Sequence, residues 1–245
     1  MKIKILGSSS GNPILGKHHA CIWVNFSYTN VLLDCGEGTA QQLLKNNLDN
    51  DIIDAIVISH FHPDHISGLF MVLQMYYLHK RKKPLSVYLP EQIDEFTKSL
   101  KLFYLFYERF PFSVDFKFTE DINKDFTQIK IIPTTHLKNY QTYLNKNELH
   151  NPMRSYAFLI SENNKTFLYT SDIDKIEDVQ NHLENIDLLV MDGLHIDAKD
   201  ILALADLKDI RIILNHGLSE NLENSLKSLN SNKFEIANED QEILL

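Results

Sequence analysis

Cysteine is scarce in this chain of 245 residues, and its scarcity excludes one common kind of metal site. The only two cysteines are Cys21 and Cys35, and neither has the paired spacing of a structural zinc site. Cys35 directly follows Asp34, so it either approaches a metal pocket or, as we expect of a free cysteine, is a buried thiol. Disulfide and all-thiolate frameworks are therefore not expected here.

Long apolar runs are also lacking. No run has transmembrane length, and residues 1–7 alternate like a strand instead of forming the long apolar core of a signal peptide. The sequence therefore predicts a cytoplasmic protein with no membrane partner. No linker, low-complexity run or exact repeat interrupts the chain, and 44% hydrophobic residues supply a sizeable core, so one domain over residues 1–245 is predicted.

Positive charge is in deficit, with 24 Lys and Arg against 33 Asp and Glu and a formal net charge of −9. This balance opposes nonspecific adhesion to nucleic acid, because such binding rests on phosphate neutralisation by cations, and no DNA partner is expected. One local exception is the basic run from Lys80 to Lys83. At the end of a predicted helix it favours a solvated cap, and the alternative is an anion-guiding patch.

Histidine and aspartate are concentrated at one place. Directly after the apolar run 55–58, which is short and β-branched and predicts a buried strand, come His60, His62, Asp64 and His65. Because Pro63 disfavours helix in the residue before it, we expect an open loop up to Ile66 and a helix over residues 66–79. Imidazole and carboxylate ligands at a strand end suit zinc, and they tolerate manganese or iron. The stretch predicts a metal site.

The pattern His60-x-His62-x-Asp64-His65 resembles the signature of the metallo-β-lactamase superfamily. The remaining residues of that pattern follow in the family's order: Asp34, His136, Asp172 and His216. The resemblance covers almost the whole chain. It implies an α/β fold, a four-layer αββα sandwich of two mixed β-sheets flanked by helices, with the metal site at one edge.

The resemblance also implies a ligand set for two divalent metal ions, with Zn favoured and Mn or Fe tolerated. By the family pattern, one ion is held by His60, His62 and His136, and the other by Asp64, His65 and His216. Asp172 bridges the two ions, which a carboxylate permits at a separation of roughly 3.5 Å. A water shared between them loses a proton near neutral pH and becomes a nucleophile. Asp34 is expected to orient a ligand histidine.

Within the superfamily, residues 33–39 and 78–90 most resemble the phosphodiesterase branch that includes ribonuclease Z. The chain departs from that branch in two places. It has no long arm with a glycine-proline-rich tip, which those enzymes use to grip transfer RNA. In place of the His-Glu-Ala-Thr motif stands Met-Asp-Gly-Leu-His, residues 191–195. His195 either replaces the lost imidazole, donating to a phosphoryl oxygen or a leaving group, or is structural.

The function predicted on this basis is a two-metal phosphodiesterase that acts on a small phosphodiester, a cyclic nucleotide or an RNA end. Asp64, His195 and Asp34 are the residues expected to carry the chemistry beside the metal ions. One alternative is a metal oxygenase resembling the pyrroloquinoline-quinone-biosynthesis branch, whose chemistry is oxidative. Another is a non-enzymatic scaffold, which the intact ligand set disfavours because unmetallated carboxylates would crowd like charges together.

Two other segments are candidates for function. Residues 102–118 are dense in aromatic side chains, which predicts core or a homodimer interface, with a base-stacking platform as the alternative. The polar loop between His136 and Ser155 is expected to flank the pocket. Elsewhere the sequence predicts hairpins over 20–33 and 155–169 and helices over 39–46, 92–105, 175–183, 198–207 and 222–229. It predicts an outer strand over 2–6 and further strands over 85–89, 126–132, 187–191, 210–214, 234–236 and 242–244.

Overall fold

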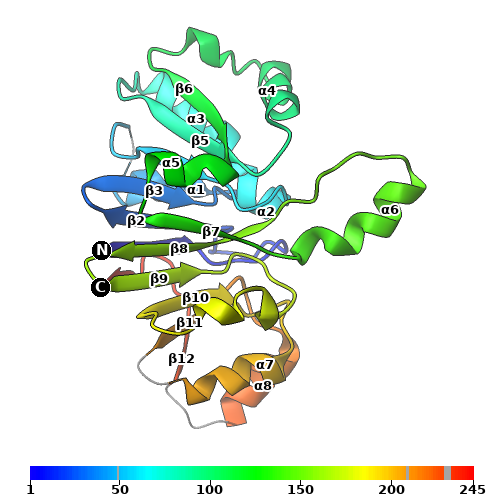
Figure 1. The fold of residues 1–245 in the computed structure, drawn as a ribbon. Coiled ribbons are helices and arrows are strands. Elements are labelled where there is room, and N and C mark those ends of the chain that lie inside the picture. The colour runs from blue at the N-terminus through cyan, green and yellow to red at the C-terminus, as the bar shows by residue number, and fades with distance from the viewer. Residues whose placement is uncertain (49, 208–209, 229–232) are drawn as a thin grey trace. The chain divides into compact units, whose positions relative to one another are not determined.

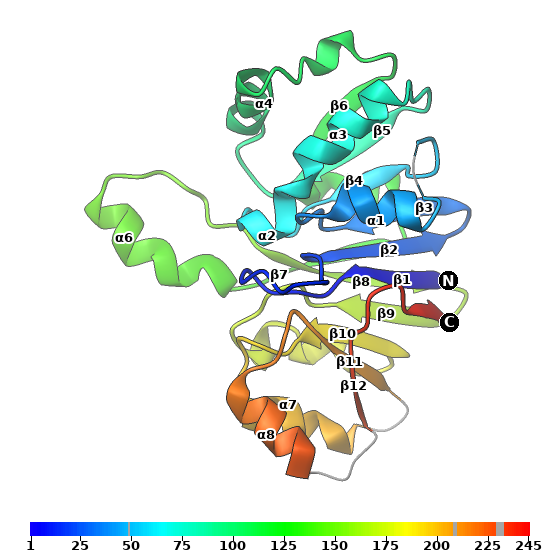
Figure 2. The same cartoon turned by 180° about the vertical axis from the view of Figure 1, so that it is seen from behind.

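A computed structural model describes residues 1–48, 50–207, 210–228 and 233–245. The chain divides into two compact units, residues 1–125 with 238–244, and residues 126–237 with Leu245. Each unit is built on one mixed β-sheet with helices against it, as Figure 1 and Figure 2 show from opposite sides. The assignment of residues 1–245 to one domain stays a prediction.

The first unit contains a seven-stranded sheet in the order β13-β1-β2-β3-β4-β5-β6. Its strands are β1 (Lys2–Gly7), β2 (Cys21–Phe26), β3 (Thr29–Leu33), β4 (Ala55–Val57), β5 (Leu85–Leu89), β6 (Val114–Phe118) and β13 (Glu242–Leu244). The pairs from β13 to β3 are antiparallel, and those from β3 to β6 are parallel. The expectation that residues 2–6 form an outer strand is wrong, because β13 returns from the far end of the sequence and pairs with β1.

Helices of the first unit cover its sheet from one face (Figure 2). They are α1 (Thr39–Lys45), α2 (Pro63–Ile66), α3 (Gly68–Leu78) and α4 (Ile93–Leu102). The short helix α5 (Ile122–Asp125) lies on the opposite side of that sheet (Figure 1), and the unit also contains the 3-10 turns η1 (Tyr107–Arg109) and η2 (Thr119–Asp121). Leu43 of α1 and Leu73 of α3 share one buried cluster with Ile56 of β4. This burial of apolar side chains, worth about 1.5–3 kcal/mol for each large one, holds the helices on the sheet.

Two predictions for the first unit need correction. The chain does not stay open until Ile66, since α2 begins at Pro63, whose fixed φ and missing N–H suit the first turn of a helix. The basic run is not wholly solvated either. Arg81 is fully buried and its guanidinium donates to backbone carbonyls, whereas Lys80 and Lys82 are exposed.

The second unit contains a six-stranded sheet in the order β12-β11-β10-β9-β8-β7. Its strands are β7 (Ile129–Pro133), β8 (Tyr156–Glu162), β9 (Lys165–Tyr169), β10 (Leu188–Asp192), β11 (Arg211–Asn215) and β12 (Phe234–Ile236). The pairs β7–β8 and β8–β9 are antiparallel, and those from β9 to β12 are parallel. Two helices, α7 (Ala198–Ala203) and α8 (Glu220–Ser228), cover one face of this sheet, and Ile201 and Leu222 share its core with Leu189 (Figure 1).

Both predicted hairpins are confirmed. The turn between β2 and β3 is made by Ser27 and Tyr28, and that between β8 and β9 by Asn163 and Asn164. All four residues have positive φ, between 45° and 66°. Two-residue turns of this kind match the right-handed twist of the strands, and asparagine tolerates the required backbone better than most residues.

The irregular segments of the second unit differ from prediction. The region expected as a helix over 175–183 is two short 3-10 turns, η4 (Ile176–Asp178) and η5 (Gln180–His182). The expected loop after His136 contains η3 (His136–Tyr140) and α6 (Gln141–Lys146), which project from the sheet between β7 and β8 (Figure 1). The helix α7 ends early and continues as η6 (Leu204–Asp206). The predicted end of the last helix, Leu229, lies outside the described residues.

Among the residues that the structure describes, no helix is both long enough and apolar enough to cross a membrane.

Candidate active site

In the first unit, two parallel strands bring the predicted residues to one edge of the sheet. Asp34 follows β3, and the stretch 59–65 follows the neighbouring strand β4. The carboxyl ends of parallel strands meet at the same edge, which is where α/β sheets commonly place their ligand sites. The parallel pairing of β3 with β4 therefore places these side chains at the same edge.

Asp34 is the central hydrogen-bond acceptor of this half of the site. It is fully buried, its Oδ1 accepts the amide of Ser59 at 2.8 Å, and its Oδ2 lies 2.9 Å from Nδ1 of His65. The carboxylate thus ties the loop after β4 to α2 and orients one imidazole. The contact agrees with the role predicted for Asp34, and the role itself stays a proposal.

The other ring nitrogens of this half gather at one point. Ser59 Oγ lies 2.9 Å from Nδ1 of His60, and Nε2 of His60 lies 3.0 Å from Nδ1 of His62. The rings of His60 and His65 have centroids 4.1 Å apart, and Oδ2 of Asp64 lies 3.5 Å from Nε2 of His65. All four predicted ligands of this half are therefore neighbours, with Asp64 and His65 placed by a helical turn and not by a loop.

Two glycines allow this packing. A Cβ on Gly68 would lie 1.9 Å from the carbonyl oxygen of Gly36, and a Cβ on Gly36 would lie 2.2 Å from the carbonyl oxygen of Asp64. The amide of Gly68 donates to the carbonyl of Cys35 at 2.9 Å. The turn after β3 thus lies directly against α2 and the start of α3, where a side chain has no room.

In the second unit, four strands end at one edge and each is followed by a predicted residue. His136 follows β7, Asp172 follows β9, His195 follows β10 and His216 follows β11. The strands β9, β10 and β11 are parallel, and β7 runs in the same direction because two antiparallel pairings separate it from β9. The sheet order therefore gathers residues that lie up to 80 positions apart.

Asp172 lies among three imidazoles of this half. Its Oδ2 is 3.1 Å from Nε2 of His216, 3.6 Å from Nε2 of His136 and 4.0 Å from Nδ1 of His195. Asp172 is only 3% exposed. A buried carboxylate of this kind requires compensating positive charge, which protonated imidazoles or metal ions supply.

Two carboxylates of this half were not predicted as site residues. Asp174 Oδ1 lies 2.8 Å from Nδ1 of His136, and its Oδ2 accepts from the amide nitrogen of Asn139 at 2.9 Å. Asp192 Oδ2 lies 2.8 Å from Nδ1 of His195. Two features of the sequence could have indicated these residues: Asp174 lies two residues after Asp172, and Asp192 lies three residues before His195.

The carboxylate of Asp192 also organises the backbone around it. Its Oδ1 accepts the amides of Leu194 and His195 at 2.7 and 3.2 Å, and its Oδ2 accepts the amide of Ile173 at 3.2 Å. The hydrogen bond that His195 donates to Asp192, opposed by burial and aided by the charges of Asp192, Asp172 and Asp174, raises the pKa of His195 to about 9. His195 thus lies beside Asp172 with one ring nitrogen held and its side chain 33% exposed.

Three non-glycine residues of the two halves have left-handed backbones. Asp34 has φ of 61°, Ser171 of 51° and His216 of 63°. Such conformations cost on the order of 1 kcal/mol each and are retained where surrounding contacts determine them, commonly at functional sites. Each of these residues lies at a strand end, beside or at a predicted ligand.

The donor chemistry of both halves fits divalent metal ions. His65 and His136 each have one ring nitrogen held by a carboxylate, of Asp34 and Asp174, while the other nitrogen faces Asp64 or Asp172. Metal-ligating histidines usually have their second nitrogen held in this way. Thiolate does not contribute, because Cys35 is fully buried and burial raises its pKa well above the ordinary value, which confirms the expected buried thiol.

The chain belongs to the β-lactamase superfamily, since the model of the family described as "Beta-lactamase superfamily domain" matches residues 29–216. Among its relatives is the ribonuclease Z of Methanococcus aeolicus, 30% identical over 167 residues that make up 67% of this chain and 48% of that protein. The chain spans no more than about half the length of the curated relatives that it matches.

Solved structures confirm the predicted fold of two mixed sheets flanked by helices. The metallo-β-lactamase fold protein YhfI from Bacillus subtilis superposes with a TM-score of 0.73 and 19% identity, covering 99% of this chain and 98% of that one. The short form of human tRNase Z superposes with a TM-score of 0.69 and 20% identity, covering 100% of this chain and 99% of that one. The family match over residues 29–216 confirms the resemblance identified from the sequence motifs.

Proposed function

We propose that this protein is a two-metal phosphodiesterase. In this proposal His60, His62 and His136 hold one divalent ion, Asp64, His65 and His216 hold a second, and Asp172 bridges them. The observation that carries the proposal is the set of oriented donor side chains at the strand ends of each sheet. In this set Asp34 holds Nδ1 of His65 and Asp174 holds Nδ1 of His136. Membership of the superfamily supports this set of ligands.

When bound, the ions supply a hydroxide near neutral pH and neutralise charge on a phosphoryl group. The chain's own residues do the rest. Asp34 and Asp174 fix the tautomers of His65 and His136, so that the ligating nitrogens carry no proton. Asp192 accepts from Nδ1 of His195, which leaves Nε2 of His195 to donate to a phosphoryl oxygen or to the leaving group.

The substrate class that we propose is an RNA end, with small phosphodiesters accepted as simpler substrates. Support comes from the relatives named ribonuclease Z, which match the chain at 30–34% identity. Zinc is the proposed metal because the donors are imidazole and carboxylate, which also bind manganese and iron.

The proposal is tested by elemental analysis and hydrolysis on one sample. Purified protein should contain about two zinc or manganese ions per chain and hydrolyse bis(p-nitrophenyl) phosphate in a chelator-sensitive way. Asp172→Ala should lose both metal and turnover. The matched control Asp115→Asn, at an exposed carboxylate that pairs with Lys117, should change neither.

Two results would contradict the proposal. Turnover retained in Asp172→Ala would show that Asp172 does not bridge two metal ions, and it would exclude the proposed two-metal reaction. Bound iron without hydrolysis, accompanied by oxygen uptake in protein purified anaerobically, would favour the oxidative alternative predicted from the sequence.

A further inference from the structure

The aromatic segment after α4 leaves a large apolar surface on the first unit. Leu102 is 74% exposed, Phe103 63% and Tyr104 82%. Tyr77 and Leu78, at the end of α3, are exposed as well. Single exposed apolar side chains are ordinary, but a group of them from neighbouring elements indicates a binding surface.

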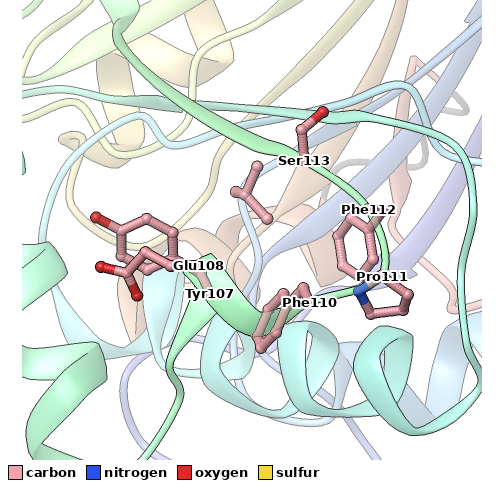
Figure 3. Close-up of a pocket in the computed structure, with 7 residues that line it drawn as sticks. Tyr107, Glu108, Phe110, Pro111, Phe112 and Ser113 are labelled. Carbon is pink, nitrogen blue, oxygen red and sulfur yellow. The ribbon is translucent and has the colours of Figure 1, made fainter.

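This surface contains a small hollow made largely of rings. Its lining is Tyr77, Tyr104, Leu105, Phe106, Arg109 and Phe110. The rings of Tyr77 and Phe110 are stacked with centroids 5.2 Å apart, and Tyr104 meets Phe106 edge to face at 6.1 Å. Phe110 also lines an adjoining shallow hollow of about 500 Å³, which Figure 3 shows with Phe112 and Pro111. We call these two hollows, together with the exposed side chains of Leu102 and Phe103, the aromatic surface.

Two charged side chains line this surface: Glu108, which Lys101 neutralises at 2.5 Å, and Arg109. Arg109 lies in the hollow, and the backbone of Lys80 closes the turn after Tyr77, with its amide donating to the Tyr77 carbonyl at 3.1 Å. The side chains of Arg109 and Lys80 are both exposed, and within the described residues neither forms an ion pair. Because the chain as a whole carries a net charge of −9, free positive charge beside exposed rings selects an anionic partner.

A row of rings connects the aromatic surface to the proposed metal ligands within the same unit. Phe61 stands between His60 and His62, and its ring lies 6.1 Å from that of Phe96. The row continues from Phe96 to Phe70 at 5.6 Å and from Phe70 to Phe103 at 5.3 Å. Three ring-to-ring steps therefore separate the metal loop from the exposed rings, a length that a few nucleotides span.

We propose that the aromatic surface binds the single-stranded part of an RNA substrate. Bases stack on Tyr104 and its neighbours, and the phosphate backbone passes Arg109. Stacking on aromatic faces together with positive charge is the usual chemistry of single-strand binding, and it requires no sequence-specific contacts. The inference rests on the proposed function, because it assigns a place to the RNA that flanks the reacting phosphate.

Charge favours RNA over a second copy of the chain. A two-fold interface places the same surface on both subunits, so Arg109 would approach the Arg109 of the other copy. Burying these unpaired cations against an apolar face would carry a desolvation penalty with no compensating charge. Phosphate groups of a nucleic acid supply that charge.

The test measures RNA binding apart from catalysis. A fluorescent single-stranded RNA of about a dozen nucleotides is titrated in the presence of chelator, and its anisotropy gives Kd. Tyr104→Ala should weaken binding roughly tenfold, and Tyr104→Phe should bind as the unaltered protein does, because the ring is retained. Arg109→Ala should lower the slope of log K against log salt by about 0.7.

The matched control removes an equally exposed ring elsewhere. Tyr28 is 98% exposed in the β2–β3 turn at φ of 66°, a backbone that asparagine tolerates, so Tyr28→Asn should leave Kd unchanged. Hydrolysis of bis(p-nitrophenyl) phosphate should be the same in all variants, since this substrate has no flanking bases, and it verifies that the variants fold.

Two results would overturn the inference. One is unchanged RNA affinity in Tyr104→Ala. The other is a shift from dimer to monomer in that variant, seen by analytical ultracentrifugation, with RNA affinity intact, which would assign the surface to a second copy. Failure of the proposed function is distinguishable, because it would abolish reporter hydrolysis in the unaltered protein while leaving ring-dependent RNA binding in place.

Discussion

The carboxylate of Asp192 holds the imidazole of His195, with Oδ2 2.8 Å from Nδ1. The same carboxylate accepts the amides of Ile173, in the segment after β9, and of Leu194, in the segment after β10. The backbone that follows two neighbouring strands therefore holds it in place. A carboxylate that fixes one ring nitrogen determines the tautomer and leaves the other nitrogen for chemistry.

His195 differs from His136 in which nitrogen faces Asp172: Nε2 of His136 faces it while Asp174 holds Nδ1, whereas in His195 the nitrogen near Asp172 is the same Nδ1 that Asp192 holds. The role proposed for His195 is therefore donation to substrate through Nε2 and not metal binding.

Replacement of His195 should therefore affect difficult leaving groups more than easy ones. His195→Ala is expected to lower kcat on an RNA substrate about 100-fold, because a ribose oxygen needs a proton to leave. The loss on bis(p-nitrophenyl) phosphate should be much smaller, since p-nitrophenolate leaves without one. Metal content should stay at the level of the unaltered protein, and equal losses on both substrates would contradict the proton-donor role.

Asp192→Asn tests the same role through the neighbouring residue. The amide retains an acceptor for the backbone but removes the charge that stabilises protonated His195. We expect a loss on RNA in the same direction as for His195→Ala and smaller, because the imidazole itself remains. Combining the two changes should add little to His195→Ala alone, since both act through one imidazole. Fully additive losses in the double variant would show that Asp192 acts independently of His195.

Asp34→Asn should weaken metal binding without removing a ligand. The variant retains an oxygen for the Ser59 amide, but it lacks the negative charge that holds Nδ1 of His65. We expect metal affinity to fall about 10- to 100-fold, as measured by competition with a chromogenic chelator. Asp115→Asn is the control for loss of one charge at the surface. Affinity unchanged in Asp34→Asn would exclude the orienting role.

The sequence was sufficient for those parts of the fold and site that local patterns determine. Apolar runs and turn residues predicted both hairpins, and the spacing of His60, His62, Asp64 and His65 predicted the donor cluster of the first unit. The strand ends carrying Asp172 and His216 were also predicted, because each ligand directly follows an apolar run.

Features that depend on distant contacts were not predictable in this way. The pairing of β13 with β1 joins the two ends of the sequence, and no local pattern indicates it. Asp174 was not predicted because its role depends on His136, 38 residues away. Arg81 was assigned to a solvated run by its lysine neighbours, although carbonyls 28 and 31 residues earlier bury it. Each case requires knowledge of which segments meet.

Arg81→Ala should destabilise the protein strongly. The guanidinium is fully buried and donates to the carbonyls of Asn50, Ile53, Lys83 and Pro84, while its carbon lies 4.7 Å from the centroid of the Tyr76 ring. Removing it leaves buried acceptors unsatisfied, and we expect a loss of about 3 kcal/mol in the free energy of unfolding.

Urea unfolding followed by circular dichroism measures this loss. Arg81→Lys should recover only part of it, because one ammonium cannot reach carbonyls arranged around a planar fork. Lys82→Ala, at the exposed neighbour, should stay within about 0.5 kcal/mol of the unaltered protein. A small effect of Arg81→Ala would mean that water replaces the guanidinium among the carbonyls.

Gly68→Ala should disturb the proposed metal site through the backbone alone. The added Cβ would lie 1.9 Å from the carbonyl oxygen of Gly36, and because that atom is backbone, the turn after β3 has to move away from α2. Asp34 and His65, on these two segments, would then separate, so we expect a loss of roughly 1–3 kcal/mol in stability together with weaker metal binding. The adjacent Ser67→Ala, at an exposed residue, is the matched control. Metal affinity and stability both unchanged in Gly68→Ala would mean that the two segments can part without loss, and that the contact between Asp34 and His65 does not depend on their close approach.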